Sequence, residues 1–364
     1  MRSKYSRNDR RNFVLVALIL LFTAALLLAA AETIVRIREE NRFGGAATPE
    51  QLLVYDPATT LTIPHPGFVS DRITINRLGF RGPEIAIPKP AGTVRLAFLG
   101  GSTTFCAEVG GDQAAWPHLV TQALQQAFPH VRFDYVNAGV PGYTVRLLQE
   151  TFEKRVRALQ PDIVVIYEAT NDLSGDSRDV ALAAGVISQR PERTSWLGRQ
   201  SLLWYLVEKN LTVALRQRAA VRPEGKAAID AEALARGFEA RLDGLVQAVR
   251  GTVPTVALAE FAPRLRRSLP ADERVRAAVT SAYYMPHLTI ESMLDGFEAY
   301  NRAIRRAAGR HGALLIETGD AIPPDDAHYT DSVHFTDAGS AALARRVAAA
   351  LADRVRPSLN APGN

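Results

Sequence analysis

One long apolar run dominates the start of the chain. Residues 13–31 read FVLVALILLFTAALLLAAA, with no charge, proline or glycine, and a helix of about 20 such residues spans a bilayer. Lysine and arginine crowd residues 1–12, so the positive-inside rule leaves that flank in the cytoplasm. We predict a single-pass signal anchor in the cytoplasmic (inner) membrane, with the rest of the chain facing the periplasm or the cell exterior. The A-x-A pattern of Ala29 and Ala31 keeps a cleaved signal peptide as the alternative.

The pattern changes twice before the main domain begins. Residues 32–49 are charged and helix-competent, and we interpret them as a stalk that the glycines at 44 and 45 end. Residues 50–93 are rich in Pro and Thr, with short alternating apolar stretches such as Ile73 and Ile75. This composition predicts a small β-rich appendage. At the other end of the chain, residues 356–364 are expected to be a flexible tail.

Apolar strand-like runs alternate with helical patterns between residues 94 and 355. The predicted strands are 94–99, 131–136, 163–169, 255–260 and 313–317, and the predicted helices lie near 115–127, 144–159, 291–309 and 337–353. Strands separated by helices form parallel crossovers, and continuously apolar strands belong to a sheet that is covered on both faces. We therefore predict an α/β fold, a three-layer α/β/α sandwich around a central parallel sheet of about five strands.

A mostly helical insertion interrupts this alternation at about 174–250. It carries an apolar stripe that includes Trp196, Leu203, Trp204 and Val207. We interpret the stripe as core-facing, because most amphipathic helices bury their apolar side. The alternative is a lid over the site or a contact with lipid.

Composition and charge narrow the function classes only slightly. The 364 residues are 47% hydrophobic, which suits a globular enzyme, and the formal charge of +5 is spread through most of the chain, so we expect no nucleic-acid partner. The basic stretch at 264–268 is interpreted as a solvated loop, with an anionic lipid or polysaccharide contact as the alternative. Cys106 is the only cysteine and the histidines are scattered, so neither a disulfide framework, a metal site nor a cofactor is predicted.

The candidate chemistry falls where predicted strands end. Ser102 follows the first strand, Asn137 and Gly139 follow the second, Asn171 follows the third, and Asp331 and His334 come after the last. In open parallel sheets the ligand site lies beyond the carboxyl ends of the strands. We therefore expect these residues to meet at one edge.

Two segments have the residue types of nucleophilic catalysis. In LGGSTTF, residues 99–105, two glycines precede Ser102, and in DSVHFTDAG, residues 331–339, Asp331 stands three residues before His334. A serine needs an imidazole to take its proton and a carboxylate to orient that imidazole. The alternatives are a helix-capping Ser102, a structural His334, or a base supplied by His287 or His328. The glycine after the serine in G-x-S-x-G is missing, which disfavours an α/β-hydrolase elbow.

Together with NAGVPGYT (137–144) and EATNDL (168–173), these segments resemble the blocks of the SGNH/GDSL hydrolase family, in order, over roughly residues 94–355. The resemblance implies a flavodoxin-like SGNH fold and a triad of Ser102, His334 and Asp331. It further implies an oxyanion hole made by the amides of Ser102 and Gly139 and the side chain of Asn171. NRLGFRGPE (76–84) resembles the lead-in of membrane-anchored bacterial members.

Two departures from the family pattern bear on substrate shape more than on chemistry. The G-D-S motif reads Gly100-Gly101-Ser102, and G-x-N-D reads Ala169-Thr170-Asn171-Asp172. The resemblance implies a serine esterase acting on an ester-bearing small molecule, lipid or glycan, such as acylated or acetylated envelope material. An O-acyltransferase to a cell-surface glycan and a non-catalytic binding module are the alternatives. A rate that rises with pH around the ordinary histidine pKa of ~6.5 is expected unless neighbours shift that pKa.

Overall fold

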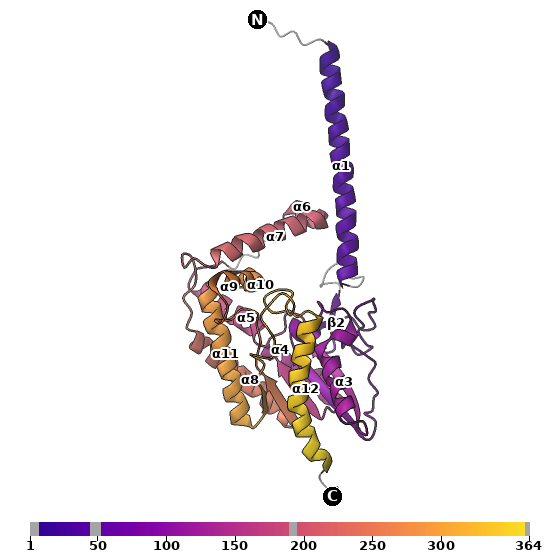
Figure 1. Ribbon diagram of the computed structural model, residues 1–364, viewed down its shortest axis with the longest axis vertical. Coiled ribbons are helices and arrows are strands. Elements are labelled where there is room, and N and C mark those ends of the chain that lie inside the picture. The colour runs from indigo at the N-terminus through magenta and orange to yellow at the C-terminus, as the bar shows by residue number, and fades with distance from the viewer. Residues whose placement is uncertain (1–6, 44–51, 189–194, 361–364) are drawn as a thin grey trace.

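The computed structural model describes residues 7–43, 52–188 and 195–360. Several expectations fall partly outside these ranges: the basic N-terminus at 1–6, the end of the stalk at 44–49, the start of the appendage at 50–51, part of the insertion at 189–194, and the last four residues of the tail. A compact body carries one long helix that projects from it like a rod (Figure 1).

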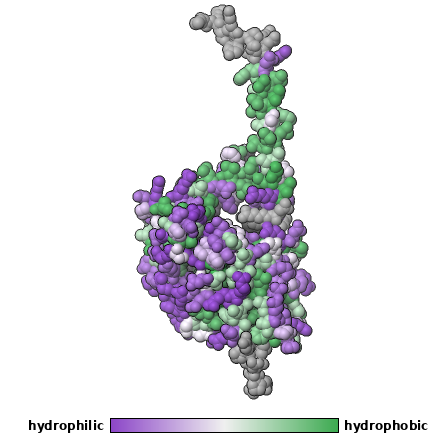
Figure 2. Space-filling model, viewed as in Figure 1, coloured by the Kyte–Doolittle hydropathy of each residue, from purple (hydrophilic) through white to green (hydrophobic). Residues whose placement is uncertain are grey.

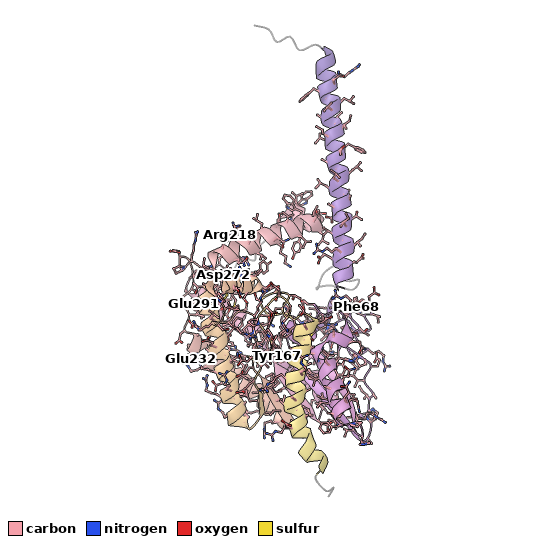
Figure 3. The ribbon with its side chains drawn as sticks, in the orientation of Figure 1. Phe68, Tyr167, Arg218, Glu232, Asp272 and Glu291 are labelled. Atoms are coloured by element: carbon pink, nitrogen blue, oxygen red, sulfur yellow. The ribbon has the colours of Figure 1, made fainter. Side chains whose placement is uncertain are left out.

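That rod is α1, Arg7–Phe43. Within the described residues it is the one helix long and apolar enough to cross a membrane, and a signal sequence would pass the same test. Its apolar side chains project on all sides (Figure 3) and are largely exposed, because no other part of the described chain covers them. The helix continues without a break through the first residues of the predicted stalk.

The body is built on a five-stranded parallel sheet in the order β4-β3-β5-β6-β7. The strands are β3 Thr93–Gly100, β4 Arg132–Gly139, β5 Ile163–Tyr167, β6 Thr255–Ala259 and β7 Leu314–Ile316. β5 reads IVVIY and is buried at every position, as expected of a β-branched strand covered on both faces. The predicted parallel sheet is confirmed.

Helices form a layer on each side of the sheet. α3 (Trp116–Ala127) packs against α12 (Asp337–Asn360), while α4 (Val145–Thr151), α5 (Thr170–Ala183), α8 (Ala231–Arg250) and α11 (Ile290–His311) pack with one another. The predicted three-layer α/β/α sandwich is therefore confirmed. Short helical segments complete the body: α2 Ser102–Phe105, η2 Asp112–Ala114, η3 Phe152–Val156, η4 Arg157–Leu159, α9 Ala271–Ala277 and α10 Val279–Tyr284.

The segment before the sheet is a short antiparallel pair followed by a long irregular stretch. β1 (Leu53–Asp56) pairs with β2 (Leu61–Pro64). Ile73 and Ile75 then bury their side chains against Leu52 and Phe105. Since Phe105 is the last residue of α2, this segment packs directly on the helix that begins with Ser102.

The apolar stripe of the insertion does not enter the core. The stripe lies on α6 (Trp196–Gln200) and α7 (Leu202–Ala219), and neither helix contains a buried residue. Trp196, Trp204 and Val207 are exposed, while Leu203 is half-buried. The expectation of a core-facing stripe is wrong, because α7 lies across the end of the body (Figure 1) and packs mainly against α10 and α1 rather than against the sheet.

Candidate active site

Ser102 begins a four-residue helix at the carboxyl end of β3, the strand between β4 and β5. A Cβ on Gly100 would lie 2.5 Å from the Tyr167 carbonyl oxygen, and one on Gly101 would lie 2.4 Å from Glu168 Oε2. A side chain at Gly100 would therefore collide with the backbone at the end of β5, and one at Gly101 would force the Glu168 and Asn171 side chains to move. Tyr167 itself lies in the middle of the body (Figure 3).

The loop after β7 brings an imidazole to this serine. His334 Nε2 lies 2.8 Å from Ser102 Oγ, and His334 Nδ1 lies 2.8 Å from Asp331 Oδ2. The other carboxylate oxygen of Asp331 accepts hydrogen bonds from the amides of Val333 (2.8 Å) and His334 (2.9 Å). When His334 is neutral and its Nδ1–H donates to Asp331, the lone pair of Nε2 is directed at the serine hydroxyl.

The two other candidate bases are engaged elsewhere. His287 Nε2 is 3.0 Å from Ser177 Oγ, and His328 Nδ1 is 2.7 Å from Asp325 Oδ1. Neither partner belongs to the group around Ser102. Of the histidines proposed from the sequence, His334 is the one that reaches the serine.

Carboxylates set the charge around His334. Burial of the ring lowers its pKa, but the charges of Glu108 and Asp331 outweigh burial, so the pKa of His334 stands above its ordinary value. Glu108 Oε1 lies 4.0 Å from Nδ1. Burial likewise acts to raise the pKa of Asp331, but the charge and hydrogen bonds of His334 hold that pKa well below its usual range. Below the raised pKa of His334, the imidazolium and the Asp331 carboxylate form an ion pair, and the Glu108 carboxylate lies beside them.

Asn171 reaches the site from the first turn of α5. Its Nδ2 donates to the Tyr143 carbonyl oxygen at 2.9 Å, and its backbone amide donates to Glu168 Oε1 at 2.9 Å. Glu168 is buried behind this turn. Burial, together with the charge of Asp172, raises the pKa of Glu168 to about 8 against the opposing amides of Asn171, Ala169 and Gly101.

Gly139 does not fit the role that the resemblance implies. It is the last residue of β4, and its amide donates to Asn137 Oδ1 at 3.0 Å. Three residues on, Gly142 adopts a left-handed backbone with φ +81° and lines the same pocket as Ser102. The glycine of NAGVPGYT that reaches the site is therefore Gly142, because the strand still runs through Gly139.

A cavity of about 250 Å³ opens at Ser102, His334 and Asn171; we call it the Ser102 pocket. Its other lining residues are largely apolar: Leu52, Phe105, Ala107, Glu108, Pro141, Gly142, Thr170, Ser174, Thr280, Ser281, Tyr284, Met285 and Val333. An apolar cleft with a few converging polar groups is the usual form of a small-molecule site. Asp331, Asn137 and Gly139 are not among its lining residues.

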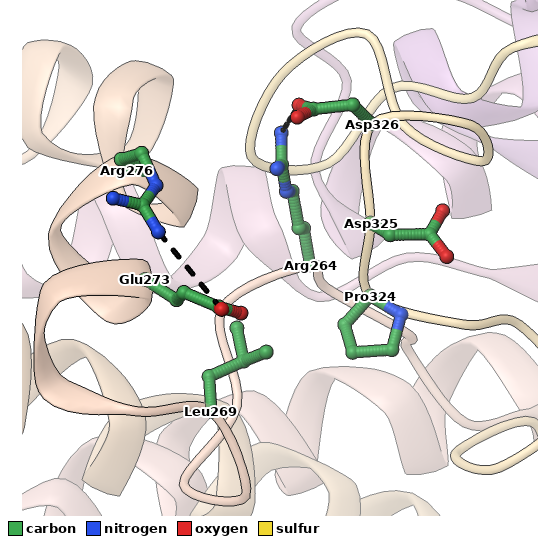
Figure 4. A pocket seen from close by; sticks show the side chains of 7 residues that line it. All are labelled: Arg264, Leu269, Glu273, Arg276, Pro324, Asp325 and Asp326. Carbon is green, nitrogen blue, oxygen red and sulfur yellow. Dashed lines mark ion pairs between the residues drawn. The ribbon is translucent and has the colours of Figure 1, made fainter.

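A second cavity, of about 240 Å³, lies between the segments that carry Arg264 and Asp326 (Figure 4). It is lined by charged side chains that pair with each other, Arg264 with Asp326 at 2.7 Å and Arg276 with Glu273 at 3.9 Å. The neighbouring Arg267 pairs with three glutamate and aspartate side chains of α11. The basic stretch at 264–268 is thus largely neutralised, which favours the interpretation as a solvated loop.

Three residues of the site are not among those predicted from the sequence. Gly142 stands within a quoted motif but is not distinguished there from Gly139. Glu168 opens the quoted EATNDL motif, three residues before Asn171, but is not singled out there. Glu108 approaches His334 only through tertiary packing, so no local pattern identifies it. Among the described residues no group of histidine, cysteine, aspartate and glutamate side chains could hold a metal ion.

The model of the GDSL-like lipase/acylhydrolase family matches residues 98–342, about two thirds of the chain. This chain belongs to that family. As a member of the GDSL-like lipase/acylhydrolase family it is an enzyme that hydrolyses ester bonds. The match begins within β3 and ends within α12, so it includes Ser102, Asn171 and the segment of Asp331 and His334.

Solved structures with partial similarity to this family member are also known. LAE5, an alpha/beta hydrolase enzyme from the metagenome of Lake Arreo, Spain, is 20% identical, with a TM-score of 0.44 and coverage of 71% of this chain and 94% of that chain. Axe2, an acetylxylan esterase from Geobacillus stearothermophilus, gives the same identity, coverage and TM-score. No curated protein matches the sequence.

Proposed function

We propose that this enzyme is a membrane-anchored serine esterase that removes acyl or acetyl groups from envelope lipid or polysaccharide. Ser102 is the nucleophile, His334 the general base and Asp331 the group that orients His334. The observation that carries the proposal is the continuous chain of two 2.8 Å contacts from Ser102 Oγ through His334 to Asp331. The α1 helix is the anchor, with the body on the periplasmic or outer side.

The reaction proceeds in two steps through a covalent intermediate. Ser102 Oγ attacks the ester carbonyl carbon while His334 Nε2 takes the hydroxyl proton, and the same proton then passes to the departing alcohol as the ester C–O bond breaks. Water next attacks the acyl-serine, giving its proton to His334, which returns it to Ser102 as the acid leaves. Asp331 stays ionised throughout and stabilises the imidazolium.

The carbonyl oxygen gains negative charge in each step and needs preorganised donors. We assign these to the amide of Ser102, the Nδ2 group of Asn171 and the amide of Gly142. The Ser102 amide stands at the first position of α2, where no intrahelical acceptor exists. Gly142 replaces Gly139 in this assignment, because Gly142 lines the Ser102 pocket together with Asn171 and Gly139 does not.

Labelling by a fluorophosphonate probe tests the nucleophile. The probe should modify the wild type and Ser174→Ala but not Ser102→Ala, since Ser174 lines the same pocket without an imidazole partner. Turnover of p-nitrophenyl acetate should fall by several orders of magnitude in Ser102→Ala, with the folded state unchanged. Labelling that persists in Ser102→Ala would assign the chemistry to another residue. Product analysis with an acceptor sugar then separates hydrolysis from acyl transfer.

A further inference from the structure

We propose that the exposed apolar side of α7 rests on the lipid bilayer that α1 spans. This side, the α7 face, consists of Trp204, Val207, Leu211 and Leu215. The proposal rests on the membrane anchor of the proposed function. It adds a lipid-binding surface to the catalytic body and fixes how that body stands relative to the membrane.

The α7 face is continuous and open to solvent. Trp204, Val207, Leu211 and Leu215 are 43%, 49%, 60% and 57% exposed. Their spacing of three or four residues places all four on one side of the helix. The C-terminal part of α7 is held to the body by Arg216 and Gln217, which donate to the carbonyl oxygens of Tyr283 and Val275. An apolar row of this kind on a water-soluble surface calls for a partner.

Hydrogen bonds fix the start of α7 at the end of the apolar run of α1. Glu32 directly follows that run. Its carboxylate accepts hydrogen bonds from Ser201 Oγ at 2.8 Å, Leu202 N at 3.0 Å and Leu203 N at 2.9 Å. The first turn of α7 is therefore tied to the point where the span would leave the hydrocarbon layer.

The direction of α7 suits a helix that lies in the membrane interface. It runs crosswise to α1 (Figure 1), so it is close to parallel to a bilayer that α1 crosses. The apolar surface of α1 passes without interruption onto α6 and the start of α7 (Figure 2). Amphipathic helices of interfacial proteins bury an apolar side a few ångströms below the headgroups in this orientation.

The side chains around the α7 face match the chemistry of a lipid surface. Trp196 on α6 is exposed, as Trp204 is, and tryptophan is enriched at the membrane–water boundary. Arg199 on α6 and Arg218 on α7 are also exposed, and Figure 3 shows Arg218 near the far end of α7. These cations suit anionic headgroups. We commit to a bilayer rather than a second copy of the chain because the face continues from the span itself.

This placement brings the Ser102 pocket close to the bilayer. α7 packs against α10, and α10 with the residue after it supplies Thr280, Ser281, Tyr284 and Met285 to the pocket wall. α12, which begins three residues after His334, starts at the α1 end of the body and runs away from it (Figure 1). The pocket thus lies at the membrane-facing end, where an ester carried by a lipid is within reach.

Tryptophan quenching by brominated lipid tests the surface in the full-length protein. Two of the three tryptophans, Trp196 and Trp204, are exposed, and Trp116 is fully buried in the core. The protein is placed in vesicles of phosphatidylethanolamine and phosphatidylglycerol with added phosphatidylcholine that is brominated close to the headgroup. We expect the wild type to lose a large part of its emission, up to the share of the two exposed rings. The Trp196→Phe/Trp204→Phe variant, which keeps Trp116, should lose none.

The outcomes separate this proposal from the esterase. The lipid-binding proposal would be overturned if the wild type kept its full tryptophan emission, or if the double variant lost as much emission as the wild type. Release of the chain from the vesicles would also overturn it. A Leu211→Cys variant that forms disulfide-linked dimers in the vesicles would assign the face to a second copy, since Cys106 is buried. Turnover of p-nitrophenyl acetate is measured on the same samples. Quenching without turnover would support the lipid-binding surface and contradict the proposed esterase function. Turnover without quenching would support the esterase function and contradict the lipid-binding surface.

Discussion

The imidazole of His334 lies among carboxylates that all raise its pKa. Asp331 holds Nδ1 directly, Glu108 lies 4.0 Å from the same nitrogen, and the more distant Glu168 adds to the effect. Burial of the ring acts the other way but is outweighed, so the pKa of His334 is raised. A raised pKa keeps the imidazole protonated to higher pH, and a protonated ring cannot accept the Ser102 proton.

Activity should therefore rise with pH at a higher midpoint than an ordinary histidine would give. As pH rises through the His334 pKa, the neutral fraction grows and kcat/KM grows with it, with a midpoint above ~6.5. Glu108→Gln removes a negative charge from beside the ring and should move the midpoint to lower pH. Asp325→Asn, next to His328 instead, is the matched control and should leave the profile in place. A wild-type midpoint at or below the ordinary value, or no shift in Glu108→Gln, would contradict this electrostatic account.

Individual residues also show where sequence reasoning reaches its limit. Ser102, Asn171, Asp331 and His334 each follow a strand of a parallel sheet, and topology alone brings such positions to one edge. The choice between Gly139 and Gly142 depends on where β4 ends, a boundary that apolar patterning fixes only to within a few residues. The approach of Glu108 to His334 depends on tertiary packing, which the local sequence does not encode.

At the scale of elements, the short helix α2 depends on a buried arginine from the segment before the sheet. The Arg81 guanidinium donates to the carbonyl oxygens of Phe105 (2.8 Å) and Cys106, at the end of α2, and to Asp112 Oδ1 at 2.8 Å. The last carbonyls of any helix lack intrahelical partners. Arg81 supplies hydrogen-bond donors to these carbonyls and so positions the helix that starts with Ser102.

Removing Arg81 should lower the free energy of unfolding by far more than removing an exposed charged residue does. The Arg81 side chain is 1% exposed, and breaking a buried ion pair by deleting one partner costs about 3 kcal/mol or more of unfolding free energy. We expect Arg81→Met to show this loss in urea denaturation, together with reduced ester turnover. Arg77→Met is the control, because Arg77 is 80% exposed and pairs with an exposed glutamate, so its loss should change little. Equal midpoints and slopes for the two variants would refute a structural role for Arg81.

The elements differ in how well the sequence foretells them. The five strands and the helices α3, α11 and α12 are predicted because the length of each apolar run, together with its pattern, separates short buried strands from longer amphipathic helices. α12 nevertheless continues to Asn360, past the predicted end near residue 353 and into the expected tail. The error at α7 has a different origin. An amphipathic pattern identifies an apolar side but not its partner, and protein, lipid or a second chain would select the same residues.

At the scale of the whole molecule, the anchor and the catalytic body are joined in two places. The chain itself connects α1 to the body, and the Glu32 carboxylate adds a second connection through the first turn of α7. Two connections restrict the position of the body more than one connection would. The fold class follows from the alternation of strands and helices, but this second connection involves residues about 170 positions apart and has no signature in the sequence.

The hydrogen bonds between Glu32 and α7 tie the body to an anchor only if α1 stays on the mature chain, so retention of the anchor is itself testable. The apolar run at 13–31 is longer than the ~7–15-residue core of a cleaved signal peptide. We expect protein isolated from membranes to have the intact mass of the full sequence and to resist extraction by alkaline carbonate. Ala29→Leu/Ala31→Leu, which destroys the A-x-A pattern, should likewise have the intact mass of its own full sequence and remain in the membrane fraction. A wild-type chain that begins at Glu32 and is recovered in the soluble fraction, beside a retained double variant, would instead establish cleavage and leave α7 without its partner helix.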